Sequence, residues 1–394
     1  MTAAAAPPDD NWRDWQLLAA ATVAFGLGFG ITFATVPSFS AQYLHIPPQQ
    51  LGWLESLREV PGLLTAGIIG LLASLAEPRI AVLALGLMAL GFGATGTADG
   101  FWTLAACNIV GSIGLHTWLT VQPSLTLTLT RPGHHGYGLG MMARYQAVAV
   151  MLGLLFVRFI ARPLGYPGTF AFAGVCAAAG IYFVSRIPAS RGGGLQERLV
   201  FRTAYWRYYA LMLLDGGRRQ VVQIFAVLIL VREFSVPIET VATLLLVNNG
   251  LTMAAAPLVG RWTDHFGERR VLTLYYALVA IVFFGYTRIS EASAAWSIAP
   301  QWIFAVLFAI DNVLFTASVG IQTYIRHTAP REELSPSLAM GLTWNHIAAV
   351  SVPLAAGWVW ARFGYERIFL CGIGLALTSL LMCLTLPHRR EYDS

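Results

Sequence analysis

The sequence predicts an all-α membrane protein built from two related six-helix bundles. The 394-residue chain is 56% hydrophobic and only 11% charged, with a mean hydropathy of +0.62. A soluble domain carries about a quarter charged residues, so the composition excludes a water-soluble core. Twelve apolar stretches alternate with short polar connections, and the second half of the chain repeats the spacing of the first.

The twelve apolar stretches have the length of about 20 residues that a helix needs to cross the hydrocarbon layer. In the first stretch, Gly26, Gly28 and Gly30 predict a face that a neighbouring helix can approach closely. The stretches predict twelve transmembrane helices, near 15–39, 48–73, 80–98, 101–129, 137–161, 167–187, 204–231, 238–259, 271–289, 296–325, 337–361 and 366–386.

The longest polar interruption divides the chain near its midpoint. It runs from Arg186 to Arg202 and contains Gly192-Gly193-Gly194, a composition typical of a flexible linker. We therefore expect an N-terminal bundle over residues 1–187, a cytoplasmic linker over 188–203 and a C-terminal bundle over 204–394.

The two halves align with each other without gaps. A shift of 190 residues places Pro47 on Pro237 and Gly70 on Gly260. A shift of 199 residues places 144–170 on 343–369. Two registers with similar offsets indicate a duplicated six-helix unit.

A short charged connection lies between the stretches 238–259 and 271–289. It carries Gly260, Asp264, Gly267, Arg269 and Arg270. We expect the two glycines to allow a sharp reversal, with Asp264 just beyond the end of the preceding helix. An acidic and a basic side chain at such a connection can form an ion pair that holds a gate between neighbouring helices closed. In the first half, Ser74 and Glu77 occupy the places of the aspartate and the second glycine.

This connection resembles the loop motif G-x-x-x-D-x-x-G-R-R of the major facilitator superfamily. The resemblance implies the fold of that superfamily, with twelve transmembrane helices in two pseudo-symmetric bundles, and transport by alternating access. It also implies that Asp264 latches the inner gate against the helix near 337–361 and its N-terminal dipole.

The arginines predict the orientation in the membrane. With the N-terminus in the cytoplasm, fifteen arginines fall in inner segments and six at outer ends, as the positive-inside rule requires. Residues 1–14 lack the basic start of a cleavable signal. We expect a multi-pass protein of the bacterial inner membrane with both termini in the cytoplasm.

Charged residues far from the predicted helix ends are candidates for the functional site, because a central Arg or Asp costs about 2.5–3.5 kcal/mol in a bilayer. We expect them to face a cavity between the halves or to pair. The predicted substrate-binding residues are Arg58, Arg144, Gln146, Arg218, Arg219, Asn248, Asn249, Asn345 and His346. The predicted proton-coupling residues are Glu59, Asp215 and Asp311.

Helical spacing predicts some of the partners. Arg58 and Glu59 point about 100° apart, so we expect Arg58 to pair with Glu55, three residues away, and not with Glu59. Asp215 precedes two arginines by three and four residues and is expected to neutralise one of them, leaving the other available.

Two further predictions concern single residues. Asp311 has no charge within a turn of its own helix and requires a partner elsewhere or a proton. For Arg144, snorkelling of the side chain to the membrane surface is an equal alternative to a role in the site, and His116 is more often a packing residue.

The first functional hypothesis is a proton-coupled secondary transporter of a small polar, anionic organic solute. Its partners are that solute, protons and the bilayer, and we expect a monomer. The alternative is an exporter of amphipathic drug-like compounds, with Trp53, Phe225, Trp302 and Trp344 lining its cavity. A third class is a membrane protein that transports nothing.

The sequence contains no nucleophile–base pair, metal-ligand spacing or phosphate loop, so we expect no enzymatic activity, cofactor, metal or nucleic-acid partner.

Overall fold

The computed structural model describes residues 12–72, 74–130, 135–191 and 201–387, and every regular element in these ranges is helical. Nine helices in this part of the chain are long and apolar enough to cross a membrane. One of them, Tyr137–Val184, bends sharply at Gly165, where the backbone leaves the helical region. The all-α prediction is therefore confirmed.

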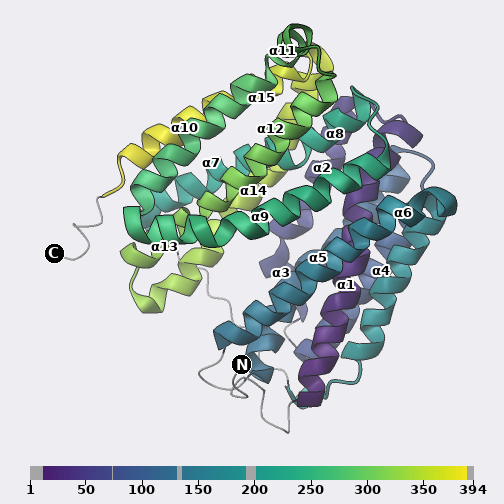
Figure 1. Cartoon of the computed structure of the whole chain (residues 1–394). Helices are drawn as coiled ribbons and strands as arrows, with labels where there is room; N and C mark the ends of the chain where they lie inside the picture. Colours follow the sequence, from purple (N-terminus) through teal and green to yellow (C-terminus); the bar gives the residue numbers. More distant parts are fainter. Residues whose placement is uncertain (1–11, 73, 131–134, 192–200, 388–394) are drawn as a thin grey trace. The chain divides into compact units, whose positions relative to one another are not determined.

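The helices follow one another along the chain as Figure 1 shows. The α-helices are α1 (Trp12–Ser38), α2 (Pro48–Leu63), α3 (Thr65–Leu72), α4 (Glu77–Thr95), α5 (Phe101–Leu129), α6 (His135–Val184), α7 (Trp206–Gln223), α8 (Phe225–Arg232), α9 (Ile238–Phe266), α10 (Glu268–Tyr286), α11 (Ile289–Trp296), α12 (Pro300–Phe315), α13 (Val319–Thr328), α14 (Arg331–Phe363) and α15 (Glu366–Leu384). A π-helix, η2 (Phe39–Tyr43), extends α1, and the 3-10 turns are η3 (Ala189–Arg191), η4 (Thr203–Tyr205) and η5 (Thr316–Ser318).

The chain forms two compact units whose boundary falls inside α2. The first unit is Met1–Leu44 with Leu57–Gln196, and the second is His45–Ser56 with Glu197–Ser394. Within the second unit, Ser56 Oγ of α2 donates to Val350 O of α14 at 2.6 Å. Of the predicted linker, residues 192–200 lie outside the described residues.

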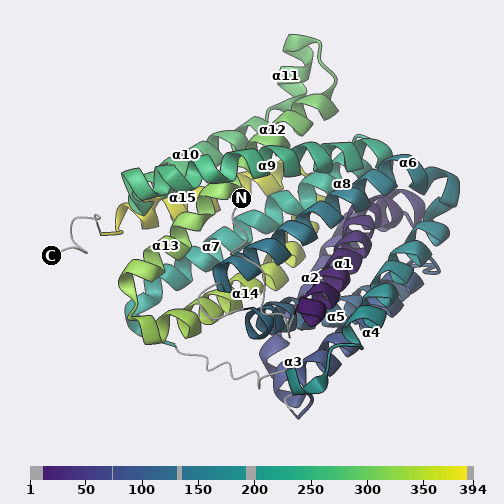
Figure 2. The same cartoon turned by 60° about the horizontal axis from the view of Figure 1, so that its bottom comes forward.

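Glycines bring α1 against both arms of α6 in the first unit. A Cβ on Gly26 would lie 2.7 Å from the Ala149 Cβ, and one on Gly30 would lie 2.6 Å from the Val150 carbonyl oxygen. A Cβ on Gly28 would lie 2.7 Å from the carbonyl oxygen of Ala173, in the second arm. The predicted packing role of these three glycines is confirmed, and Figures 1 and 2 both place α1 beside α6.

The crossing of α4 and α5 is equally tight. A Cβ on Gly91 would meet the backbone of Gly111 and would lie 2.7 Å from the Cys107 carbonyl oxygen. Backbone cannot move aside as a flexible side chain does, so a side chain at residue 91 separates the two helices.

We expect Gly91→Ala to reduce the yield of folded protein several-fold, because overpacking a helix crossing typically costs about 1–3 kcal/mol. Gly86→Ala, in the same helix, is the matched control, since its nearest neighbour would lie at 3.9 Å. Size-exclusion chromatography of the fluorescently tagged protein measures the yield. Equal yields from the two variants would contradict the tight crossing.

In the second unit, α7 packs on α14 and α15, and α10 runs along α15 (Figure 1). Tyr286 of α10 stacks on Phe369 of α15 at 4.1 Å between ring centroids, and Phe304 of α12 packs on both rings. The short helix α11 stands at one end of this unit, beyond its neighbours α10 and α12 (Figure 2).

Three of the predicted helices are interrupted. The stretch 48–73 breaks at Leu64, 204–231 breaks at Ile224, and the 3-10 turn η5 interrupts α12–α13. At two of these places a threonine hydroxyl donates to a backbone carbonyl of its own helix, Thr65 to Pro61 at 3.0 Å and Thr316 to Val313 at 2.7 Å. Such bonds bend helices. The predicted helix 296–325 begins at Pro300, and α11 precedes it.

A chain reversal occurs at corresponding positions of the two units. Gly165 has φ +65° and Gly364 has φ +86°, and they lie 199 residues apart. Only glycine adopts this left-handed backbone without strain. The following tyrosines pack alike, Tyr166 on Phe39 at 5.2 Å and Tyr365 on Phe234 at 6.0 Å between ring centroids. The first reversal lies in the connection expected between the stretches 137–161 and 167–187.

Candidate functional site

A buried ion pair joins α7 and α12 in the second unit. Arg218 Nη1 donates to both carboxylate oxygens of Asp311, at 2.8 and 2.9 Å. Arg218 is 1% exposed and Asp311 is 2% exposed. Asp311, which the sequence left without a partner on its own helix, therefore has one on α7.

Asp215 lies one turn before Arg218 and is held by hydroxyl groups from α10. Tyr275 and Tyr276 each donate to Asp215 Oδ1, at 2.9 and 3.1 Å. The same oxygen is 3.9 Å from Arg218 Nε. The guanidinium therefore lies between two carboxylates, bonded to Asp311 and within reach of Asp215. We call Asp215, Arg218, Tyr275, Tyr276 and Asp311 the α7 charge cluster.

Aromatic rings enclose the α7 charge cluster. The Arg218 guanidinium lies 5.1 Å from the centre of the Phe315 ring and 5.4 Å from that of Tyr275, distances at which a cation is attracted to a ring face. The Tyr286 hydroxyl is buried and has no hydrogen-bond partner in the described ranges. The enclosure excludes water, which strengthens the electrostatic interactions within it.

The neighbouring arginine has a different hydrogen-bond partner. Arg219 Nε donates to Gln223 Oε1 at 2.6 Å, and its guanidinium lies 5.3 Å from the Phe315 ring centre. The expectation that Asp215 neutralises one arginine of this pair is only half right. Arg218 is the arginine nearest Asp215, but its bonded partner is Asp311, because α12 brings that carboxylate closer.

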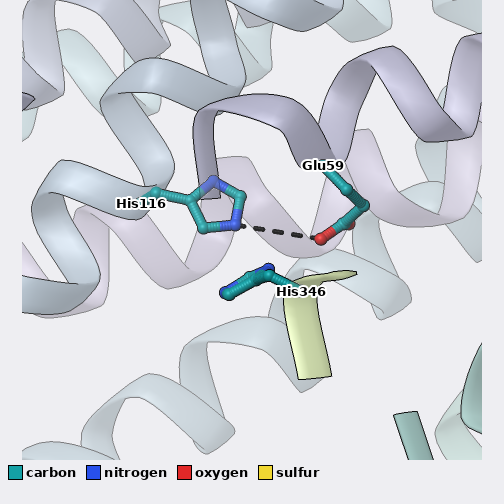
Figure 3. Close-up of side chains that lie close together, drawn as sticks. All are labelled: Glu59, His116 and His346. Carbon is teal, nitrogen blue, oxygen red and sulfur yellow. Dashed lines mark ion pairs between the residues drawn. The ribbon is translucent and has the colours of Figure 1, made fainter. Parts of the chain in front are cut away.

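A second group of charged residues lies in the first unit, where α2 meets α5. Arg58 Nη2 forms an ion pair with Glu59 Oε1 at 2.8 Å, and Glu59 Oε2 is 3.9 Å from His116 Nε2 (Figure 3). Ser112 donates to the Arg58 backbone oxygen and lies 3.1 Å from His116 Nδ1. Glu59 and His116 are both 8% exposed.

The prediction that Arg58 and Glu59 do not pair directly is wrong. Their Cβ atoms do diverge by about 100°, but the long, flexible arginine side chain reaches around the helix to the carboxylate. Glu59 is turned toward α5, where His116 provides a second polar neighbour (Figure 3). One carboxylate and one imidazole are two donors of the kind that bind transition metals.

The remaining predicted substrate residues are spread over both units. Arg144 and Gln146 lie on the first arm of α6, and Arg144 is exposed. Asn248 is 5% exposed, and its Nδ2 has no partner among the residues described. Asn249 donates to Leu245 O at 2.8 Å, and Asn345 donates to Met212 O of α7 at 3.4 Å. His346 follows on α14, partly exposed.

One aromatic residue is not where the exporter hypothesis requires it. Phe225 was expected to line a cavity, but it is 0% exposed and packs against Trp360 at 6.0 Å between ring centroids. Trp53 and Trp302 are about half exposed, at 48% and 52%. Trp344 is partly exposed and stacks on Tyr209.

The charged connection after α9 corrects two expectations. Asp264 lies inside the last turn of α9, which continues to Phe266, and not beyond the helix. Gly260 also lies within α9, and a Cβ there would meet nothing within 4 Å, so it takes no part in the reversal. Gly267 makes the turn alone, with φ +81°. Arg269 Nη1 then donates to Leu386 O at 2.9 Å, whereas Arg270 is exposed.

We expect Gly267→Ala to impair folding or transport, because an L-residue with this backbone costs about 1–2 kcal/mol. Gly260→Ala is the matched control from the same connection, and it should be neutral or slightly stabilising because alanine favours a helix. Unfolding in detergent and transport in vesicles measure the difference. Identical behaviour of the two variants would show that the turn tolerates a side chain.

Sequence reasoning missed a pair of buried glutamates that begin equivalent helices. Glu77 starts α4 and accepts a hydrogen bond from Ser124 at 2.7 Å, while Glu268 starts α10 and lies 3.3 Å from His327 Nδ1. They are 1% and 2% exposed. A helix N-terminus stabilises a carboxylate, and the available signal was that each glutamate lies three residues before a predicted stretch, 80–98 or 271–289. No spacing rule signalled the two tyrosines that bind Asp215.

A contact on the surface of the second unit joins Arg202 and Tyr205 to α14. Tyr205 donates to Glu333 Oε2 at 2.7 Å, and Arg202 Nη2 donates to Oε1 at 2.7 Å. The Tyr205 and Arg202 hydrogen bonds lower the pKa of Glu333.

This contact should open only in acid. A carboxyl group whose pKa is lowered on folding stabilises the folded state above its unfolded pKa and loses that effect as the pH falls through the lowered value. We expect amide hydrogen exchange at 203–206 to accelerate only below the ordinary pKa range of glutamate. In Tyr205→Phe the acceleration should begin at higher pH. An unchanged dependence of exchange on pH would contradict the role of the Tyr205 hydrogen bond in lowering the pKa of Glu333.

Comparison with known proteins places these features in context. The sequence profile described as Major Facilitator Superfamily matches residues 18–214 and again residues 208–394. No curated protein sequence matches the chain. The nucleoside transporter NupG has a similar structure, with a TM-score of 0.76 at 10% identity over 95% of this chain and 98% of that one.

Transporters of different solutes have similar structures as well. A bacterial homologue of the iron transporter ferroportin, in an inward-facing state, gives a TM-score of 0.76 at 12% identity, covering 97% of this chain and 99% of that one. A D-xylose–proton symporter gives 0.71 at 14% identity over the same shares. Identities this low show a shared fold alone, so the substrate has to be argued from the side chains.

Proposed function

Because the chain belongs to the Major Facilitator Superfamily, we propose that it carries a small organic solute with an anionic polar group across the membrane, coupled to protons. It is a secondary transporter with the fold of that superfamily and not an enzyme. The coupling ion and the class of solute are the proposal.

The α7 charge cluster is the observation that carries proton coupling. With both carboxylates ionised, two negative charges and one positive charge leave one excess negative charge in a fully enclosed place. Such a charge is costly unless it is neutralised, and a proton neutralises it without requiring space. Asp311 exchanging Arg218 for a proton, while Arg218 turns to Asp215, would couple protonation to the arrangement of α7 and α12.

The remaining residues take roles around that exchange. Glu59, close to His116, is a second carboxylate for the proton path in the first unit. We assign the solute to Arg58, Arg144, Gln146, Arg219, Asn248, Asn249, Asn345 and His346, with Arg218 reaching it when Asp311 is protonated. The inner gate depends on Asp264, Gly267, Arg269 and Arg270. The proposed setting is a bacterial inner membrane, with a monomer whose termini are both cytoplasmic.

Reconstituted vesicles test the proposal. Purified protein in liposomes containing a pH-sensitive dye is offered organic acids, sugars, amino acids and lipophilic cations, with and without an imposed pH gradient. We expect an organic acid to dissipate the gradient and to accumulate at its expense. Transport of neutral or cationic solutes only, or uptake indifferent to the gradient, would contradict the proposal.

A further inference from the structure

A cavity of about 400 Å³ opens in the first unit between α1 and the first arm of α6. Its walls are apolar except for one cation, and they are formed by Val23, Met141, Arg144, Tyr145, Val148 and Leu152. The α6 residues recur at the spacing of a single helix face. The volume falls in the range of small-molecule sites, about 300–1,000 Å³.

Arg144 is the unusual member of this wall. No ion pair or hydrogen bond joins it to another residue of the described chain, whereas Arg58 has Glu59 and Arg218 has Asp311. It lies seven residues after the start of the span Tyr137–Val184, about 10 Å along the helix. Its side chain is exposed and stands among apolar side chains, so its guanidinium is accessible to an anionic ligand.

The cavity is held in shape by the packing around it. Tyr145 is set edge-on against Trp15 at 6.0 Å between ring centroids. One turn further along α6, Ala149 packs against Gly26 of α1. A Cβ on Gly26 would lie only 2.7 Å from the Ala149 Cβ. The arginine, the tyrosine ring and the aliphatic wall are therefore presented together without a rearrangement of the helices.

We propose that this cavity binds an organic monoanion with an apolar body, such as an aliphatic or aryl-alkyl carboxylate. Arg144 would hold the carboxylate through two parallel hydrogen bonds, the geometry that a guanidinium favours, and Val148, Leu152 and Tyr145 would cover the hydrocarbon. This inference rests on the proposed function, because the bound anion is the transported solute. It adds that the solute is amphipathic.

Calorimetric titration of the whole purified protein tests the site. Octanoate and 3-phenylpropionate are titrated into protein washed free of lipid in a neutral detergent, with octanamide as the uncharged analogue. We expect both acids to bind and the amide to bind about tenfold more weakly, since a charge-assisted hydrogen bond is lost. Equal affinity for acid and amide would overturn the proposal.

Two arginine variants make the test specific. Arg144→Gln should weaken binding of the acids by about tenfold or more. Arg158→Gln, which removes the same charge from the same helix at an arginine that lies over the Phe159 ring, should bind like the wild type. Unchanged affinity in Arg144→Gln, or equal losses in both variants, would overturn the assignment.

An anionic lipid shares the chemistry of the proposed ligand, so lipid is tested in the third part of the experiment. Phosphatidylglycerol and phosphatidylcholine are added in turn before the acids are titrated. We expect the acids to bind in either lipid. Binding of phosphatidylglycerol with none of either acid would overturn the solute site. The titration uses no pH gradient, so failure of proton coupling in vesicles with intact acid binding would contradict only the proposed function.

Discussion

Arg218→Gln should destabilise the protein more than any other neutral substitution of an arginine in its second unit. The change leaves Asp311 and Asp215 buried together without their counter-ion. Breaking a buried ion pair by removing one partner costs about 3–5 kcal/mol, which is a large part of the roughly 5–15 kcal/mol that stabilises a typical protein. Denaturant unfolding of the purified protein in micelles measures the loss.

The adjacent arginine provides the control. Arg219 binds the uncharged Gln223 and is only partly buried, so Arg219→Gln should lose much less stability. The double variant Arg218→Gln with Asp311→Asn removes both charges of the pair and should recover part of the loss. If the two single arginine variants lose the same free energy of unfolding, the buried ion pair does not contribute the stability expected from its burial.

Asp311→Asn should abolish proton-driven accumulation while leaving downhill movement of the solute intact. The amide cannot exchange an arginine for a proton, so the pH gradient no longer drives the cycle. One pH unit corresponds to about 1.4 kcal/mol, or a factor of about ten for each coupled proton. Under that gradient, the accumulation ratio should fall from about tenfold in the wild type to about one in the variant.

Uptake into vesicles with and without the gradient measures this effect. Asp99→Asn is the matched control, because Asp99 is at an exposed turn where it accepts a hydrogen bond from Thr103, a bond that an amide oxygen also accepts. Gradient-dependent accumulation by Asp311→Asn equal to that of the wild type would remove this carboxylate from the proton path. Loss of accumulation in both variants would point to a general defect.

The sequence predicts well those features that depend on local chemistry. The glycines of α1, the reversal at Gly165 and the apolar spans were all recognisable. A missing side chain or a run of apolar residues affects the structure at its own position in the sequence. The interruption at Ile224 was not recognisable, because no proline or glycine marks it. The threonines beside the other two breaks act through bonds that spacing alone does not distinguish from ordinary helical residues.

Partners distant in the chain were beyond local spacing. Arg218 and Asp311 are 93 residues apart, and no helical period relates them. The prediction for Arg58 failed differently, because it treated Cβ directions as if they fixed the positions of the charged groups. A side chain with four rotatable bonds reaches well beyond its Cβ direction, so it can pair with the carboxylate of the adjacent residue.

The reversals at Gly165 and Gly364, each with its tyrosine packed on an aromatic ring, offer a matched pair of attachment points. Because they are built alike, a spectroscopic label placed beside each would sit in the same local surroundings. Distances measured from each label to positions within its own unit could then be compared directly between the two units. Motion during a transport cycle could be assigned to one unit or the other without a reference outside the protein.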